Sequence, residues 1–299
     1  IDVEHSIYEV PLMLQREGLD DLICECLDLK TKPADMEYWR DIIRKLTTPR
    51  HQVRIAVVGK YVELQDAYKS VYEAVIHGGV ANDCGVEIER VDAEDIEENG
   101  AAKTLKGCSG VLVPGGFGER GTEGKIQAAQ YARENNIPYL GLCLGMQTAT
   151  IEFARNVLKL EDAHSVEFDP GTADPVIALL DEQQNVTDKG GTMRLGSQLC
   201  SLKPGSLAAK LYGAKEIHER HRHRFEFNNA YREPFEAAGL VFSGTSQDGN
   251  LVEIVEVTEH PFYVASQFHP EFKSKPDKPH PLFSGFIAAA HACDHNKTV

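Results

Sequence analysis

The chain has 299 residues, of which 42% are hydrophobic and 26% charged, a composition typical of a globular protein of about two domains. Its 46 acidic residues outnumber the 31 basic ones, and the net charge of −15 makes non-specific binding to nucleic acid or to an anionic membrane unfavourable. Because no run of about 18 apolar residues and no basic-then-apolar N-terminus occurs, we expect neither a membrane span nor a signal peptide.

The seven cysteines are odd in number and irregular in spacing. Cys24 and Cys26 are too close together for the usual metal-ligand spacing, so the sequence predicts neither a disulfide framework nor a zinc site. This usage fits a reducing compartment, and we expect a cytoplasmic protein without a bound metal.

Residues 1–50 differ from the rest of the chain. Helical patterns cover residues 19–29 and 35–46, no alternating strand pattern occurs, and the stretch 47–50 marks a boundary. We interpret 1–50 as a helical linker or the end of a preceding domain, and the chain, which begins at Ile1, as a piece of a longer protein. The main domain is expected over 51–293, and a disordered tail over 294–299.

From residue 53 the pattern alternates between strand and helix. Strands are predicted at 53–59, 85–91, 110–114 and 137–142, and helices at 66–77, with Asp66 as the cap, and at 124–134. The acidic run 92–95 is interpreted as a solvated surface. This alternation predicts an α/β fold whose central, mostly parallel sheet is flanked by helices.

Cys143 follows the fourth of these strands, with Gly141 and Gly145 two residues away on either side. A sharp strand-to-helix turn needs such glycines, and the helix predicted at 146–158 would direct its dipole at the sulfur and favour the thiolate. The backbone N–H of Leu144 would be free to act as an oxyanion donor. The pattern indicates a nucleophile elbow, although Cys143 as a small core residue stays an alternative.

The second half has an antiparallel character, and we expect it to form a smaller antiparallel sheet. Strands are predicted at 175–180, 192–202, 240–244 and 251–257, with a hairpin turn at 246–249 and a mobile loop at 182–191. The charged run 219–224 is either a solvated edge strand or a functional segment, and its own pattern does not separate the two.

His269 ends the last predicted strand, and Glu271 follows two residues later. In strand geometry residues two apart project to the same side, so Glu271 can orient the imidazole while its other nitrogen faces a nucleophile. The glycines of the 114–118 loop can bring a second N–H to an oxyanion. No phosphate-binding P-loop motif occurs anywhere in the chain.

Together the Pro-Gly-Gly-Phe-Gly loop at 114–118, the Gly-Leu-Cys-Leu-Gly-Met-Gln elbow at 141–147 and the Phe-His-Pro-Glu segment at 268–271 resemble the class I (triad) glutamine amidotransferase family. The segments 59–62, 66–68, 191–196 and 220–228 resemble the branch in which this domain follows a synthetase that aminates UTP to CTP. Residues 7–12 resemble the end of that synthetase.

The resemblance implies a role for several residues. It makes Cys143 the nucleophile, His269 the general base and acid, and Glu271 its partner. By the same resemblance the oxyanion hole comprises Gly115, Gly116 and Leu144; the glutamine-binding residues are Phe117, Gln147, Glu167, Arg224 and Phe225; and Arg120, Met193, Arg194 and Leu195 belong to a lid or to coupling with an activator. A carboxylate at Glu167 is suited to the α-ammonium group of glutamine.

The implied activity is hydrolysis of L-glutamine through a γ-glutamyl thioester, without a cofactor in this domain. ATP, Mg²⁺ and the activator GTP would belong to the full-length enzyme, a homo-tetramer whose N-terminal synthetase domain is the partner. The alternatives are a glutaminase subunit of another synthase, a γ-glutamyl hydrolase, and a regulatory module without catalysis; an intact Cys143, His269 and Glu271 weighs against the last.

Overall fold

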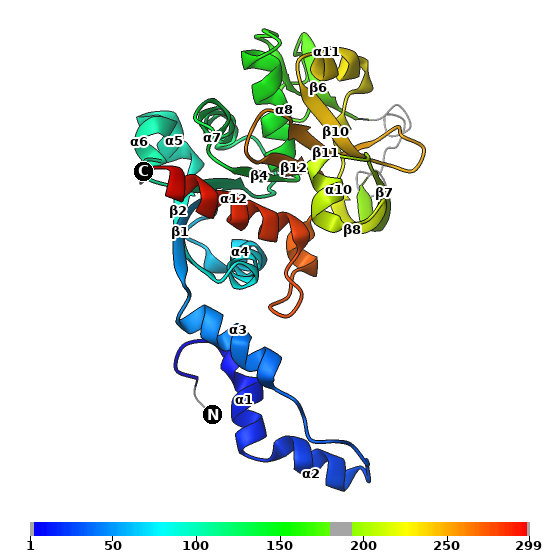
Figure 1. The fold of residues 1–299 in the computed structure, drawn as a ribbon. Helices are drawn as coiled ribbons and strands as arrows, with labels where there is room; N and C mark the ends of the chain where they lie inside the picture. Colours follow the sequence, from blue (N-terminus) through cyan, green and yellow to red (C-terminus); the bar gives the residue numbers. More distant parts are fainter. Residues whose placement is uncertain (1–2, 180–192, 298–299) are drawn as a thin grey trace.

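The computed structural model describes residues 3–179 and 193–297. A helical arm at the N-terminus leads into a main body built around one large sheet (Figure 1). The predicted mobile loop at 182–191 lies outside the described residues. None of the helices in the described ranges is both long and apolar enough to cross a bilayer.

The main sheet has nine strands, in the order β2-β1-β3-β4-β12-β11-β10-β7-β8. The first five are parallel to one another and the remaining pairings are antiparallel. Their bounds are β1 His51–Gly59, β2 Cys84–Asp92, β3 Gly110–Val113, β4 Tyr139–Leu142, β7 Arg194–Leu202, β8 Glu216–His223, β10 Leu240–Thr245, β11 Val252–Val257 and β12 Tyr263–Ser266.

A second, smaller sheet has the strand order β5-β6-β9. It consists of β5 Ala163–Ser165, β6 Asp174–Ala178 and β9 Glu226–Phe227. The predicted fold class, α/β with a second small sheet, is confirmed, but this sheet is mixed and not antiparallel, because β5 pairs with β6 in parallel. The antiparallel strands of the second half, however, extend the main sheet, because β12 pairs in parallel with β4 on one side and antiparallel with β11 on the other.

Helices cover both faces of the sheet, as the apolar runs require. Along β1, Val53, Ile55 and Val57 point into one hydrophobic cluster while Ala56 and Val58 point into the other. One face is covered by α4 Lys69–Ala81, α10 Leu207–Tyr212 and α12 Pro281–Lys297, and the other by α5 Ala93–Asn99, α7 Thr122–Glu134, α8 Leu144–Asn156 and α11 Arg232–Ala237.

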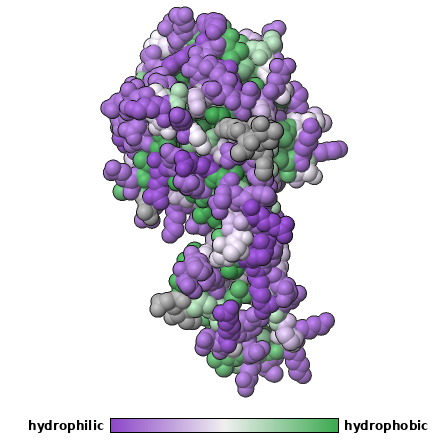
Figure 2. Space-filling model, turned by 60° about the vertical axis from the view of Figure 1, so that its left-hand side comes forward, coloured by the Kyte–Doolittle hydropathy of each residue, from purple (hydrophilic) through white to green (hydrophobic). Residues whose placement is uncertain are grey.

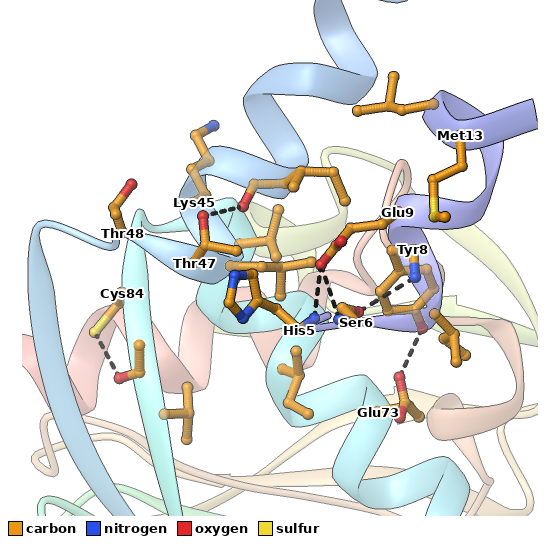
Figure 3. A pocket seen from close by; sticks show the side chains of 18 of the residues that line it. His5, Ser6, Tyr8, Glu9, Met13, Lys45, Thr47, Thr48, Glu73 and Cys84 are labelled. Atoms are coloured by element: carbon orange, nitrogen blue, oxygen red, sulfur yellow. Dashed lines mark hydrogen bonds between the residues drawn. The ribbon is translucent and has the colours of Figure 1, made fainter. Parts of the chain in front are cut away.

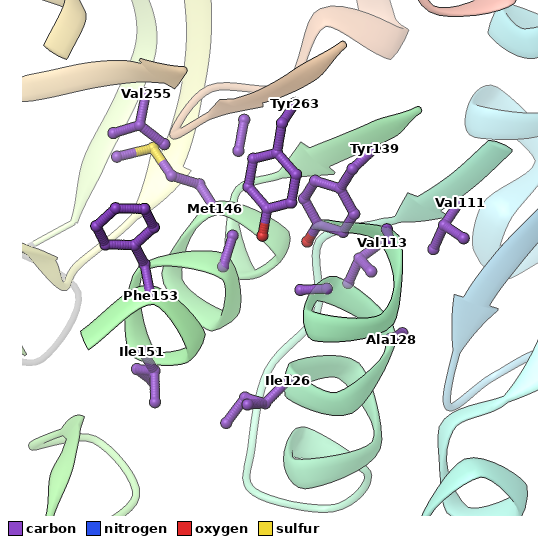
Figure 4. Packing of buried hydrophobic residues seen from close by; sticks show 14 of the residues in the cluster. Val111, Val113, Ile126, Ala128, Tyr139, Met146, Ile151, Phe153, Val255 and Tyr263 are labelled. Carbon is purple, nitrogen blue, oxygen red and sulfur yellow. The ribbon is translucent and has the colours of Figure 1, made fainter. Parts of the chain in front are cut away.

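Two stacked tyrosines lie where the parallel part of the sheet meets the antiparallel part. The rings of Tyr139 on β4 and Tyr263 on β12 are 4.5 Å apart, centroid to centroid, and both are fully buried (Figure 4). The Tyr139 hydroxyl donates to the backbone oxygen of Gly145, 2.8 Å away. This bond ties the start of α8 to the core, and the turn before α8 is thereby fixed.

Two local predictions were wrong and one was incomplete. Asp66 does not cap the helix predicted at 66–77, because a 3-10 turn, η2 Gln65–Tyr68, precedes α4, whose N-cap Tyr68 makes no side-chain cap bond. The acidic run at 92–95 is a helix start, with the Asp92 carboxylate accepting from the Glu94 N–H. The final helix α12 continues to Lys297, into the stretch predicted as a disordered tail, and Asp294 accepts a bond of 2.6 Å from the Ser109 hydroxyl.

The arm contains the turn η1 Ile7–Glu9 and the helices α1 Val10–Arg16, α2 Leu19–Cys26 and α3 Glu37–Thr47. It projects away from the main body, and apolar residues reach its surface (Figures 1 and 2). The exposed apolar side chains of α2 and the loop after it include Leu22, Ile23, Leu27 and Leu29. The prediction that residues 1–50 are helical is confirmed. Their assignment as a linker or as the end of a preceding domain stays a prediction.

Tyr8 anchors the arm to the main body. Its hydroxyl donates to Glu73 Oε2 at 2.6 Å (Figure 3) and lies 2.8 Å from His77 Nε2, both on α4. Within the arm, the Trp39 indole donates to the Tyr8 backbone oxygen. A cavity of about 1000 Å³ lies between the arm, α4 and β2 around these contacts. Because the arm adds few buried apolar side chains, these polar contacts carry much of its attachment.

Replacing Tyr8 by phenylalanine should loosen the arm. Loss of the hydroxyl leaves Glu73 and His77 without their partner, which costs about 1–3 kcal/mol for a buried polar group. Amide hydrogen exchange of α1 and α3 should become faster. As a control, Tyr38→Phe on the same arm removes only an exposed bond to the Asp277 carbonyl. Equal exchange in the two variants would contradict the anchoring role.

Candidate active site

Cys143 occupies the turn between β4 and α8 in a strained backbone conformation, with φ 52° and ψ −102°. A Cβ at Gly145 would lie 2.1 Å from the Val113 carbonyl oxygen, and one at Gly141 would lie 2.7 Å from the Gly145 oxygen. Larger residues therefore cannot occupy either position, and the predicted steric role of both glycines is confirmed. The elbow also places Cys143 at the N-terminus of a helix of 13 residues.

The sulfur of Cys143 is enclosed by polar groups. The Gln267 amide nitrogen lies 3.7 Å from Sγ, and the Arg222 carbonyl oxygen lies 4.0 Å from it. The Cys143 N–H donates to the Ser266 oxygen at 2.7 Å, which fixes the elbow against the end of β12. Nothing in the local sequence pattern marks Gln267, because its contact with Cys143 spans more than a hundred residues.

His269 and Glu271 form the predicted pair, but not in strand geometry. β12 ends at Ser266, His269 is the N-cap of the 3-10 turn η5 Pro270–Lys273, and Glu271 lies in that turn. The His269 Nδ1 is 2.8 Å from Glu271 Oε1, and the His269 N–H donates to the Arg220 oxygen. The other ring nitrogen, Nε2, is buried and has no partner within ordinary hydrogen-bond geometry in the described ranges, but the Cys143 sulfur is near enough to interact with the imidazole beyond that limit.

The charge on His269 depends on its two partners. Burial disfavours the imidazolium, but hydrogen bonding and charge attraction from Cys143 and Glu271 outweigh burial and raise the pKa of His269 to about 10. The imidazole therefore carries a proton at neutral pH. This pairing stabilises the fold fully below pH 6.5, and the contribution is lost as the pH rises through about 10.

Removing the sulfur should change how His269 titrates. In Cys143→Ala the interaction with the sulfur is lost while burial and the interaction with Glu271 remain, so the pKa of His269 should fall from about 10. Imidazole proton NMR as a function of pH measures this change. His260 is a control within the same molecule, since burial alone is the main cause that lowers its pKa. An unchanged His269 midpoint would show that Cys143 does not interact with it.

The five predicted substrate-binding residues line one cavity beside Cys143. Its volume is about 90 Å³, and it is lined by Gly116, Phe117, Cys143, Gln147, Glu167, Met193, His223, Arg224 and Phe225. Sites for drug-sized ligands have roughly 300–1,000 Å³. The cavity is thus suited to a ligand as small as one amino acid.

Two of these residues are already held in place. The Gln147 amide donates to the Phe225 carbonyl at 3.2 Å and to Gln267 Oε1 at 3.4 Å. Burial raises the pKa of Glu167, while a backbone hydrogen bond from Gly118 and the nearby positive charges of Arg224 and Lys60 oppose that rise. A carboxylate that lies half-desolvated beside a small cavity would gain from a cationic ligand group.

The predicted oxyanion donors lie on two elements that meet at the elbow. Leu144 is the first residue of α8, so its N–H has no partner within the helix. Gly115 packs against His269 and Cys143, where an added Cβ would lie 2.9 Å and 3.4 Å from His269 Cε1 and Cys143 Cβ. The loop at 114–118 is therefore close enough to the sulfur to supply a second donor.

The predicted lid and coupling residues do not form one unit. Met193 lines the cavity, and Leu195 is exposed. Arg194 is held by two buried carboxylates, Glu226 at 3.2 Å and Glu253 at 2.8 Å, and its place in a lid stays a prediction. Arg120 lies outside the cavity and donates to Glu94 and to the Lys60 carbonyl. Residues 190–192 of the predicted lid lie outside the described residues.

The charged run 219–224 is an edge strand with one buried face. Along β8, Glu219, His221 and His223 are buried while Arg220 and Arg222 face outward. The interpretation as a solvated strand was therefore wrong for every second residue. His223 reaches the cavity, and its ring lies 2.9 Å from that of His221, nitrogen to nitrogen. The alternation of basic residues was the only signal in the sequence for this arrangement.

A family model described as Glutamine amidotransferase class-I matches residues 63–289, which is most of the chain. The cysteine elbow and the sheet around it agree with that match, and the chain belongs to the class-I glutamine amidotransferase family.

The relatives are more particular. Proteins named CTP synthase from Rippkaea orientalis and Bacillus subtilis are 56% and 54% identical over 98% and 95% of this chain, which corresponds to 53% of each relative. The chain thus spans about half the length of the curated relatives it matches. A solved structure described as Trypanosoma brucei CTPS, glutaminase domain with bound acivicin, is 43% identical, with a TM-score of 0.75, over 80% of this chain and 93% of that one.

Proposed function

We propose that this chain hydrolyses L-glutamine to glutamate and ammonia, as the glutaminase domain of a CTP synthase. One observation carries the proposal: the cavity of about 90 Å³ opens onto Cys143 and is lined by Gln147 and Glu167, while the His269–Glu271 pair lies beside the same sulfur. An amino acid with a side-chain amide matches both the size of this cavity and its polar lining.

In the proposed mechanism the Cys143 sulfur attacks the side-chain amide carbon of glutamine. The carbonyl oxygen becomes an oxyanion, which the N–H groups of Leu144 and of Gly115 or Gly116 stabilise. The C–N bond then breaks, and His269 gives its proton to the departing ammonia, leaving a γ-glutamyl thioester on Cys143. Water attacks the thioester while His269 accepts a proton, and glutamate leaves with the sulfur restored.

We further propose that Glu167 binds the α-ammonium group of glutamine. Arg224 and the backbone at Phe225 would also contact the bound glutamine. Phe117, whose ring is half exposed, would cover the cavity. The already raised pKa of Glu167 supports its role, because a bound cation restores the charge that burial disfavours. A γ-glutamyl hydrolase or a glutaminase of another synthase would differ in substrate profile.

The ammonia would serve amination of UTP to CTP in a synthetase domain of the same protein, since the relatives are about twice as long as this chain. ATP and Mg²⁺ would act in that synthetase domain. Activation by GTP near Arg120, assembly as a homo-tetramer and a cytoplasmic location belong to the same proposal.

Labelling with the glutamine analogue 6-diazo-5-oxo-norleucine tests this function. Mass spectrometry should find one label per chain, at Cys143, and excess glutamine should block it. The exposed Cys26 is an internal control for general thiol reactivity. Acivicin is a second probe, because it was bound in the T. brucei domain. Labelling of Cys26 equal to that of Cys143, or labelling that glutamine does not block, would overturn the proposal.

A further inference from the structure

Lys125 is a buried lysine that the mechanism above does not use. It lies in the first turn of α7, has no exposed surface, and its neighbour Ile126 packs in the core (Figure 4). Its Nζ makes no hydrogen bond to any part of the chain that the structure describes. A buried ammonium group without a partner is unfavourable for folding, so its presence suggests a function.

The ammonium group lies behind the oxyanion loop. A Cβ at Gly116 would be 3.8 Å from Lys125 Nζ and 3.6 Å from Leu144 Cδ2, while the adjacent Gly115 faces Cys143 and His269. The Lys125 charge and Cys143 therefore both lie close to the two glycines of this loop. Because Lys125, Cys143 and Leu144 are buried, little water screens the charge from that side, although the loop itself is partly exposed.

We propose that Lys125 is a positioning residue that holds a positive charge behind the loop at 115–116 and so favours the conformation and the potential that stabilise the oxyanion. This role rests on the proposed glutaminase function. Neutral glutamine carries no net charge at its amide oxygen, whereas the tetrahedral intermediate does. The attraction is therefore stronger in the transition state than in the substrate complex, and it should raise kcat without changing KM.

Charged groups on three neighbouring segments decide when Lys125 is protonated. Burial, followed by repulsion from Lys60 and Arg120, lowers the pKa of Lys125 to about 8, while Asp92 and Glu97 oppose this change. The charge is thus present at neutral pH and lost as the pH rises through about 8. His269 loses its proton only near pH 10, so the two groups can be distinguished in a pH profile.

The test is steady-state glutamate release by the full 299-residue chain between pH 6 and 10.5, for wild type, Lys125→Met, Lys125→Arg and the exposed control Lys103→Met. In the wild type and in Lys103→Met, kcat should decline above pH 8. Lys125→Met should have a kcat about tenfold or more lower at pH 7, an unchanged KM and no decline near pH 8. Its melting temperature should be equal or higher, because a buried charge is removed. Lys125→Arg keeps the charge throughout this pH range, so it should retain activity and show no decline of kcat above pH 8.

Three outcomes would overturn the inference. One is a Lys125→Met variant with the kcat and pH profile of the wild type. Another is a lower kcat in Lys125→Met that is fully explained by a smaller fraction of folded protein. The third is a wild-type kcat that stays constant from pH 7 to 9, which needs no variant. A wild type that releases no glutamate would overturn the proposed function itself, and this inference with it.

Discussion

Replacing Cys143 by alanine should abolish glutamine hydrolysis, with a fall in kcat of about 10⁴-fold or more. No other group in the cavity can form the thioester, and loss of the nucleophile in comparable triads removes nearly all of the catalytic acceleration. The fold should persist, because the Cβ and the backbone bonds of the elbow remain. The assay is glutamate release by variant and wild type of equal circular dichroism. A variant that keeps more than a hundredth of the wild-type rate would require another nucleophile.

The same position should reveal its backbone strain. Cys143 has a positive φ of 52°, which L-residues with a side chain rarely adopt. Cys143→Gly relieves the clash of the Cβ and should be at least as stable as Cys143→Ala, even though glycine gains more entropy in the unfolded chain. Urea unfolding of the two inactive variants gives the comparison. If the glycine variant were less stable by more than about 1 kcal/mol, the elbow would not be strained.

The largest effect on stability is expected for Arg194→Met. The guanidinium lies between the buried carboxylates Glu226 and Glu253, and it is the cation that contacts both. Burial raises the pKa of Glu226 to about 8 and also raises the pKa of Glu253, while the charge of Arg194 opposes both changes. Without Arg194 a buried carboxylate loses its partner, which should cost about 3–5 kcal/mol in the free energy of unfolding. Chemical denaturation at pH 7 measures this loss.

Two matched variants separate this cost from general effects of losing an arginine. Arg120→Met removes an arginine whose ion pair with Glu94 is exposed, so its unfolding midpoint should not change. Burial favours the neutral form of Glu226, which a glutamine resembles, so Glu226→Gln should be better tolerated than Arg194→Met. The raised pKa of Glu226 stabilises the fold below about pH 4.5, and that contribution is lost as the pH rises through 8; the glutamine variant should lack this dependence. Equal destabilisation by Arg194→Met and Arg120→Met would contradict the buried pairing.

The sequence alone determined the features that depend on a few neighbouring residues. The spacing of Gly141, Cys143 and Gly145 fixes a sharp turn, because any side chain at the glycines would collide with nearby backbone. Similarly, His269 and Glu271 are close enough along the chain to meet in a 3-10 turn as well as in a strand. Likewise, continuous apolar strands that alternate along the chain with helices indicate a parallel sheet covered by helices on both faces. These are short-range steric and hydrophobic effects, and they are visible in a single sequence.

Only the tertiary structure decided which distant segments share an environment. The antiparallel strands join the main sheet because β12 pairs with β4, a contact between segments more than a hundred residues apart. The placement of Gln267 against the sulfur, of Arg194 between two carboxylates, and of Lys125 behind the oxyanion loop follows from that pairing and from the packing of α7 and α8. From residue type alone, a charged side chain is predicted to be exposed. Whether it is buried instead depends on the side chains that surround it in the folded protein.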